Sequence, residues 1–401
     1  MTRSRPILGG LIVLYFVIGL EVLVMISPFA AFFYAAFNPV LLFLARWPAT
    51  HWLADFFLPH MVTPPGAFLR AVRVAGSALF VGGAAVFLIC AGQVYWSKLA
   101  RRGPVVGGLY RWIRHPQYLA LGATGLGLAI LWPRFLTAVL WAVMAALYYA
   151  LARDEERRMT ARFGEQYGAY VDRTGMFLPR AVEGALARVP GLRRPGLRAA
   201  AGIAFLFALA VGGAFALRDY TIHELPFWSG GSVWALPLLP SDEPMVEHRM
   251  ADALKLPEIQ ARLPADTPVL AYVLPVDYVM QGMIADTDPA WRLYQHHQTL
   301  PMIADWVFHP FRHLEGGHAG HAGMMMHHPE MGATASGTVR RIIFVRVDAP
   351  GGEVTPAALL ATGAPRRPLF FADVDLHALR CERVQDLGPG TGWGNVPTPM
   401  F

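Results

Sequence analysis

Residues 119–151, with the sequence LALGATGLGLAILWPRFLTAVLWAVMAALYYAL, consist of two apolar runs separated by Trp132, Pro133 and Arg134. A membrane-spanning helix needs about 20 mostly apolar residues, and proline cannot continue a helix through its interior. We therefore expect membrane helices at 119–132 and 135–151, joined by a tight turn. Helices joined in this way pack antiparallel, so residues just before the first should lie close to residues just after the second.

The composition of the chain indicates a membrane protein. Of its 401 residues, 55% are hydrophobic and 15% are charged, whereas soluble domains carry about 25% charged residues. Apolar runs at 7–26, 69–91 and 199–217 give, with the hairpin, an α-helical core of about five transmembrane helices. The first run lacks a small-residue cleavage site, which favours an uncleaved helix over a signal peptide. An aromatic segment at 47–60 suits the membrane interface.

The basic residues predict the orientation of these helices. They gather at the N-terminus, at 98–114 and at 152–198, and five crossings place all three on the cytoplasmic side. We expect an integral protein of a bacterial inner membrane, with a cytoplasmic N-terminus and an extracytoplasmic C-terminal domain. The net charge of +6 then indicates contact with the lipid bilayer rather than with nucleic acid. Cys90 and Cys381 fall in different compartments, which excludes a disulfide framework.

Four parts of the chain are predicted. Residues 1–64 hold the N-terminal transmembrane helix and the interfacial segment, 65–180 form the main membrane core, and 181–217 form a basic linker and the last helix. Residues 218–401 have moderate hydrophobicity, many prolines and short strand-like runs. They favour a soluble α+β or mostly β domain.

Two basic side chains, Arg114 and His115, directly precede the hairpin. His115 precedes Pro116, so it lies at or next to the N-cap of the first hairpin helix. The N–H groups of the first turn are free there and the helix dipole is positive. This combination predicts a binding site for a carboxylate or phosphate at the membrane edge. The alternative is a topology signal made of arginines that reach the lipid headgroups.

An acidic cluster, Asp154-Glu155-Glu156, follows the second hairpin helix. Pairing with Arg158, one turn away, would make it a solvated helix face. However, the hairpin should return these residues to the neighbourhood of 114–118. Carboxylates beside a basic anion site can hold a ligand that has separate anionic and cationic parts.

Together the two clusters resemble the isoprenylcysteine carboxyl methyltransferase and phospholipid N-methyltransferase superfamily, over about residues 65–180. The first motif of that superfamily corresponds here to Gly108, Tyr110, Arg114, His115, Pro116 and Tyr118. The second corresponds to Glu155, Glu156, Phe163, Gly164, Tyr167, Tyr170, Leu178 and Pro179.

The resemblance implies a cytoplasmic pocket for S-adenosylmethionine in this membrane core. The residues implied to bind the cofactor are Tyr110, Arg114, His115, Tyr118, Glu155 and Glu156. The residues implied to act in catalysis are His115, Arg114 and Glu155, although either glutamate could instead orient Arg114. The implied reaction is methyl transfer to a lipophilic or membrane-partitioned acceptor, which could be a carboxylate, a thiol or an amine.

Two other classes of function stay open. Sterol reductases and related membrane enzymes have a similar Arg-His-Pro-x-Tyr region and bind NADPH. Alternatively, the pocket is only a scaffold, and the outer domain is a non-enzymatic metal-binding or assembly module.

A histidine- and methionine-rich segment at 313–332 supports that last alternative. Imidazole and thioether ligands favour copper, although a flexible low-complexity loop that binds metal adventitiously has the same composition. The candidate copper ligands are His318, His321, Met324, Met325, Met326, His327 and His328.

Overall fold

The structure is a computed structural model of the whole chain. It describes residues 40–59, 61–62, 66–100, 103–189, 194–278, 280–287, 337–349 and 354–391. The predicted first membrane helix and the His/Met-rich segment lie outside these residues. The chain divides into two compact units, the first formed by Met1–Gly19 and Arg70–Ala216, the second by Leu20–Leu69 and Leu217–Phe401.

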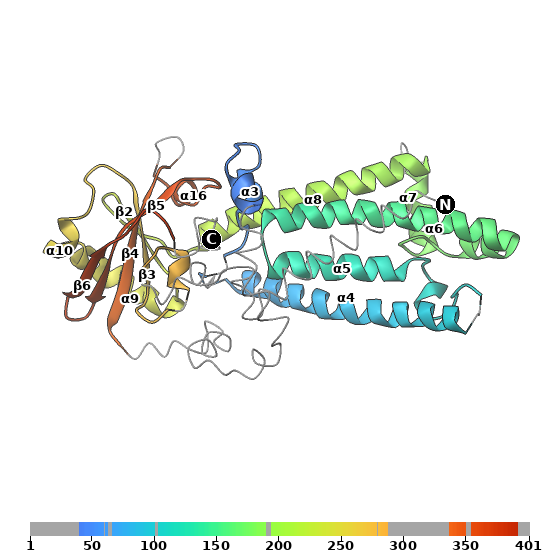
Figure 1. Cartoon of the computed structure of the whole chain (residues 1–401), viewed down its shortest axis with the longest axis horizontal. Helices are drawn as coiled ribbons and strands as arrows, with labels where there is room; N and C mark the ends of the chain where they lie inside the picture. The colour runs from blue at the N-terminus through green and yellow to red at the C-terminus, as the bar shows by residue number, and fades with distance from the viewer. Residues whose placement is uncertain are drawn as a thin grey trace, which may run out of the picture. The chain divides into compact units, whose positions relative to one another are not determined.

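Four apolar helices lie in the described part of the chain (Figure 1). They are α4 (Ala67–Leu99), α5 (Pro116–Leu131), α6 (Phe135–Arg173) and α8 (Pro195–Glu224). Three of them are long and apolar enough to cross a membrane, over Ala67–Ser97, Phe135–Arg173 and Gly196–Glu224, and α5 is a shorter apolar helix. The predicted fold class, an apolar helical core followed by a β-rich domain, is confirmed.

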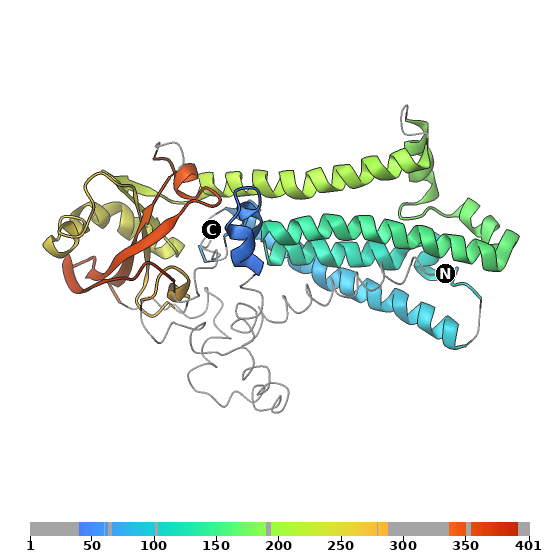
Figure 2. The ribbon, with the colours of Figure 1, turned by 45° about the horizontal axis from the view of Figure 1, so that its top comes forward.

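The predicted hairpin is formed by α5 and α6, which run side by side in opposite directions (Figures 1 and 2). The indole N–H of Trp141 on α6 donates to the carbonyl of Gly122 on α5 at 2.8 Å. A side chain on Gly125 would press against Trp141 and Met144 of α6. The absence of a side chain there lets the two helices approach closely.

Glycines also bring α4 close to α5. A β-carbon on Gly127 of α5 would overlap the backbone of Phe80 on α4, and one on Gly83 would overlap Thr124 and the carbonyl of Ala120. Small residues at helix contacts allow the backbones to approach where no hydrophobic effect drives association. Helix α5 therefore packs closely against both α4 and α6.

Helix α6 continues well beyond the apolar run and bends at Gly164. The backbone of Gly164 has φ 53° and ψ −129°, a combination that residues with a β-carbon avoid. The charged stretch after the hairpin is helical, and the bend redirects its last turns. A short helix, α7 (Arg180–Arg188), follows before α8 begins.

The second unit is built on a six-stranded sheet in the order β1-β2-β3-β4-β5-β6. Neighbouring strands are antiparallel except for the parallel pair β2 and β3, whose crossover contains α9 (Glu243–Ala253) and α10 (Pro257–Gln260). Apolar side chains of α9 pack on one face of the sheet. The strands are Trp228–Gly230, Val233–Pro237, Val269–Pro275, Val339–Val347, Arg366–Asp375 and Arg380–Asp386.

The N-terminal stretch before α4 belongs to this second unit. It contains α3 (His51–Ala54), after which Phe56, Phe57 and Leu58 are buried. The hydroxyl of Tyr278 donates to the carbonyl of Met61 at 3.2 Å. These aromatic residues pack within the unit that contains the sheet, and their predicted place at the membrane interface stays a prediction.

Candidate functional site

The backbone around Arg114 and His115 is held by the chain that leaves α6. His115 is the N-cap of α5 and Pro116 occupies the first helical turn, as predicted from the His-Pro pair. The N–H of Arg114 donates to the carbonyl of Gly175 at 2.8 Å, and the N–H of His115 donates to that of Met176 at 3.1 Å. This short stretch of parallel pairing joins the two sequence motifs directly.

The guanidinium of Arg114 is buried and connects Glu156 to the end of α6. Its Nε lies 2.5 Å from Oε1 of Glu156. Its Nη1 donates to the carbonyl of Val171 at 3.1 Å and to that of Thr174. The last carbonyls of a helix lack intrahelical partners and carry partial negative charge, so an arginine there stabilises the helix end.

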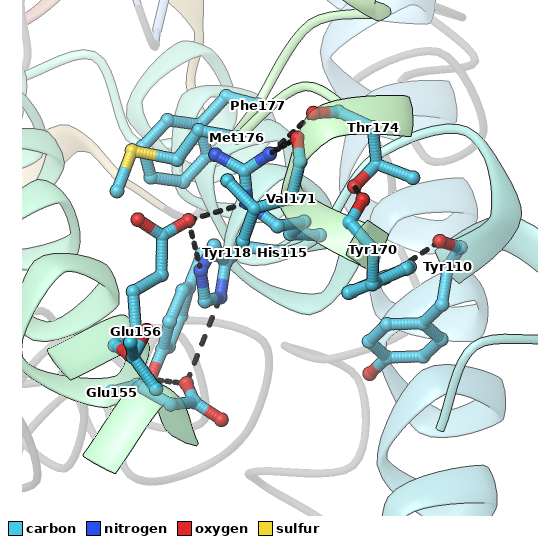
Figure 3. A network of polar contacts seen from close by, with 12 residues as sticks. Tyr110, His115, Tyr118, Glu155, Glu156, Tyr170, Val171, Thr174, Met176 and Phe177 are labelled. Atoms are coloured by element: carbon cyan, nitrogen blue, oxygen red, sulfur yellow. Dashed lines mark hydrogen bonds and ion pairs between the residues drawn. The ribbon is translucent and has the colours of Figure 1, made fainter. Parts of the chain in front are cut away.

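The imidazole of His115 lies between the two glutamates (Figure 3). Nδ1 is 3.6 Å from Oε2 of Glu155, and Nε2 is 3.5 Å from Oε1 of Glu156. His115 is only 2% exposed, and neither ring nitrogen has a hydrogen-bond partner among the described residues. The rings of Tyr118 and Phe177 lie 5.6 and 5.9 Å from the imidazole, centroid to centroid. A buried, polar and aromatic environment thus surrounds the imidazole, and each of its nitrogens faces a carboxylate.

Glu155 is the more accessible of the two glutamates. Its side chain is 39% exposed, compared with 15% for Glu156, and it accepts a long hydrogen bond of 3.4 Å from the hydroxyl of Tyr118. The neighbouring Asp154 pairs with Arg158 on the solvated side of the helix. The alternative in which the acidic cluster pairs with Arg158 therefore holds for Asp154 alone. Both glutamates face His115 instead.

Tyr110, the other residue of the first motif, makes contacts within the protein. It is buried in a 3-10 turn, η1 (Gly108–Arg111), and its hydroxyl donates to the carbonyl of Cys90 on α4 at 3.5 Å. Its own carbonyl accepts a 2.6 Å hydrogen bond from the hydroxyl of Tyr170. Burial raises the pKa of the Tyr110 phenol. The structure thus places Tyr110 between α4 and the second motif, and its contact with the cofactor stays a prediction.

Sequence reasoning missed two residues that shape the site, Gly175 and Glu183. One carboxylate oxygen of Glu183 accepts N–H bonds from Met176, Phe177 and Leu178, at 2.7, 3.2 and 3.4 Å. A β-carbon on Gly175 would overlap the carbonyl of Leu178. The sequence signal that could have identified Glu183 is its position in the first helical turn after Pro179. Carboxylates stabilise helix N-termini at such positions.

Comparison with known families agrees with the motif assignment. Residues 86–166 match the family model described as phospholipid methyltransferase. The matched segment runs from the second half of α4 to just beyond the bend in α6 and contains all six residues predicted to bind the cofactor. The resemblance to this superfamily is confirmed for this part of the chain. Searches among curated proteins and among solved structures gave no match.

The predicted copper ligands stay a prediction, because all of them lie in the undescribed segment. Among the residues that the structure does describe, no group of three or more histidine, cysteine, aspartate or glutamate side chains could hold a metal ion. Cys90 and Cys381 are both free thiols.

Proposed function

We propose that the protein is an integral membrane methyltransferase that uses S-adenosylmethionine to methylate a lipophilic acceptor, with its site on the cytoplasmic side. The observation that carries the proposal is the imidazole of His115 held between Glu155 and Glu156 at the start of α5. These residues lie within the segment that matches the phospholipid methyltransferase family. His115 belongs to the first of the two motifs from which the function was predicted, and the glutamates belong to the second.

The residues present fit the charges of this cofactor. The N–H groups of Gln117 and Tyr118 are in the first turn of α5 and have no intrahelical acceptor. They suit the cofactor carboxylate, and the imidazole of His115 lies beside them as the N-cap of the helix. The half-exposed carboxylate of Glu155 suits the ammonium group or the ribose hydroxyls. The ring of Tyr118 is stacked on His115 and on Tyr148, at 5.6 and 5.3 Å, and this aromatic cluster suits a neighbouring nucleoside.

Arg114 takes a different role from the one first implied. Its guanidinium is occupied by Glu156 and by two carbonyls at the end of α6. We assign Arg114 and Glu156 as positioning residues, because their ion pair and the bonds of Arg114 to the end of α6 hold the residue next to His115 in place. The predicted alternative, in which a glutamate orients Arg114, is the one that these contacts favour.

The bound cofactor supplies a methyl group on a positively charged sulfur, ready for direct displacement. The protein would hold the methyl group in line with the acceptor, which lowers the entropic part of the barrier. The buried surroundings of His115 exclude water and strengthen the attraction between an anionic acceptor and the sulfonium. If the acceptor is an amine or a thiol, His115 can accept its proton.

The family match favours an acceptor attached to a lipid. The description of the matching model names phospholipid, and α4 carries large exposed apolar side chains, among them Val81 and Leu88. Such side chains are compatible with lipid around the helices. A carboxylate, a thiol and an amine are the acceptor groups to test.

The direct test is titration calorimetry of the full-length protein with S-adenosylhomocysteine, the product of methyl transfer. We expect binding by the unaltered protein and an affinity at least about tenfold weaker in His115→Ala and Glu155→Ala, a loss of about 1.4 kcal/mol or more. Glu165→Ala, on an exposed part of α6, is the matched control and should bind normally.

Circular dichroism of each variant separates a loss of binding from a loss of fold. The proposal is wrong if the unaltered, folded protein does not bind S-adenosylhomocysteine. NADPH, titrated in the same way, tests the reductase alternative, which predicts that NADPH binds instead.

A further inference from the structure

Helix α7 turns its apolar side outward. Val182, Leu186 and the C-cap residue Val189 are 45%, 42% and 42% exposed, and Ala185 between them is also exposed. Their spacing places them on one face of the helix. The half-buried residues of α7 include Glu183 and Ala187. A surface helix in water usually turns its apolar side towards the protein, so this face suits an apolar or amphipathic surrounding.

The connections of α7 indicate which surrounding is available. Figures 1 and 2 both place α7 at the end of the first unit where α6 finishes and α8 starts. Only residues 174–179 and 189–194 separate it from these two apolar helices. If both helices cross a membrane, α7 cannot lie far from its surface, and it is too short to cross.

The charges at the ends of α7 indicate an anionic surface. Exposed arginines occupy both ends of α7, Arg180 and Arg188, the last position of α6, Arg173, and the connection to α8, Arg194. Amphipathic helices with basic residues beside an apolar face bind at the interface of membranes that contain anionic lipids. The acidic residue of α7, Glu183, is already occupied by three backbone N–H groups.

The same glutamate couples α7 to the candidate site. The carboxylate of Glu183 holds residues 176–178. Within that stretch, Met176 pairs with the backbone of His115 and Phe177 lies against its ring. A change in the position of α7 would therefore move one wall of the site.

We propose that α7 lies in the headgroup region of an anionic lipid surface, with Val182, Ala185 and Leu186 facing the acyl chains, and that this docking keeps the Met176–Leu178 wall against His115. The docking is independent of the proposed function, whereas its effect on the site rests on that function.

The test of docking uses the full-length protein in lipid nanodiscs. Cys381→Ser removes the partly exposed thiol, and Leu186→Cys or Arg188→Cys introduces a site for an environment-sensitive fluorophore. These two positions are close in sequence but lie on nearly opposite faces of α7. In phosphatidylcholine with phosphatidylglycerol, we expect brominated lipid to quench the label at 186 at least about twofold more than the label at 188. Omitting phosphatidylglycerol, or combining Arg180→Gln with Arg188→Gln in the Leu186→Cys protein, should reduce the quenching of the label at 186 by brominated lipid.

Two results would overturn the docking. If aqueous iodide quenched the labels at 186 and 188 equally, both faces of α7 would be in contact with water. Protection of the 186 label from both iodide and brominated lipid would show that protein covers the face, either residues 1–39 or a second copy.

The effect on the site has a separate readout. S-adenosylhomocysteine should bind several-fold more tightly in nanodiscs that contain phosphatidylglycerol, and Leu186→Asp should abolish this difference. Equal affinity in both lipids would contradict the coupling while leaving the proposed function intact. Absence of binding in any lipid would contradict the proposed function, and the quenching experiment would still decide the docking.

Discussion

Glu155 and Glu156 are adjacent in the chain, yet they have different surroundings. Glu156 forms a short ion pair with the buried Arg114, while Glu155 is half-exposed and has only contacts of 3.4 Å or longer. A short buried ion pair fixes structure, because removing one partner leaves the other charge without compensation. A loosely bonded carboxylate at the edge of a site is available to a ligand.

Exchanging each glutamate for glutamine should separate these roles. Glu156→Gln should lower the free energy of unfolding by on the order of 3 kcal/mol, because Arg114 would keep its charge without an anion. Glu155→Gln should change it by less than about 0.5 kcal/mol and still weaken S-adenosylhomocysteine binding at least about tenfold. Unfolding titrations followed by tryptophan fluorescence, combined with calorimetry, measure both quantities. Equal effects of the two exchanges on stability would contradict this division.

A buried tyrosine in the second unit predicts a dependence of stability on pH. Burial raises the pKa of Tyr272 to about 12, from an ordinary value of 10.0, and its hydroxyl has no hydrogen-bond partner among the described residues. The phenol is neutral in the folded state. The stability that this group contributes is therefore fully present below pH 10 and is lost as the pH rises towards 12. The loss should be about 2 kcal/mol.

Tyr272→Phe is the matched variant, because it removes the ionisable hydroxyl without breaking a hydrogen bond. It should be at least as stable as the unaltered protein at neutral pH. It should also lose less stability between about pH 10 and 12, as followed by the circular dichroism of the sheet. An unchanged alkaline unfolding profile would contradict the assignment.

At the scale of elements, the bend in α6 positions the second motif. Gly164 changes the direction of the helix, after which Tyr170 donates to the carbonyl of Tyr110 and the helix ends against Arg114. The hairpin brings the glutamates to His115, and the bend brings the end of α6 back to the same place. The sequence motif Phe-Gly therefore has a conformational explanation.

Two glycines on α6 provide a paired test of this bend. Neither Gly164 nor Gly168 has an atom within 4 Å of the position of an added β-carbon, so space alone does not distinguish them. Gly164→Ala should destabilise the protein by about 1–2 kcal/mol, because its φ is positive. Gly168→Ala, in regular helix, should stabilise it by about 0.5–1 kcal/mol. Thermal unfolding of both variants in the same detergent gives the comparison, and changes of the same sign would contradict the explanation.

At the scale of the whole molecule, the sequence predicted the features that depend on helix length and proline position. The hairpin and the meeting of His115 with Glu155 follow from the apolar runs and Pro133. The contacts of Arg114 with the end of α6 could not be predicted, because backbone pairing between distant segments leaves no local pattern. The aromatic segment around Phe56 was ambiguous for another reason, since an apolar run suits a membrane interface and a protein core equally well.

The central claim is that the hairpin brings the two motifs together to hold a sulfonium nucleoside, and an experimental structure with S-adenosylhomocysteine bound tests it most directly. We predict that the ligand carboxylate lies beside His115 and the first turn of α5, with Glu155 contacting its ammonium group or its ribose. A ligand bound elsewhere, with His115 and both glutamates keeping only each other as neighbours, would contradict the account.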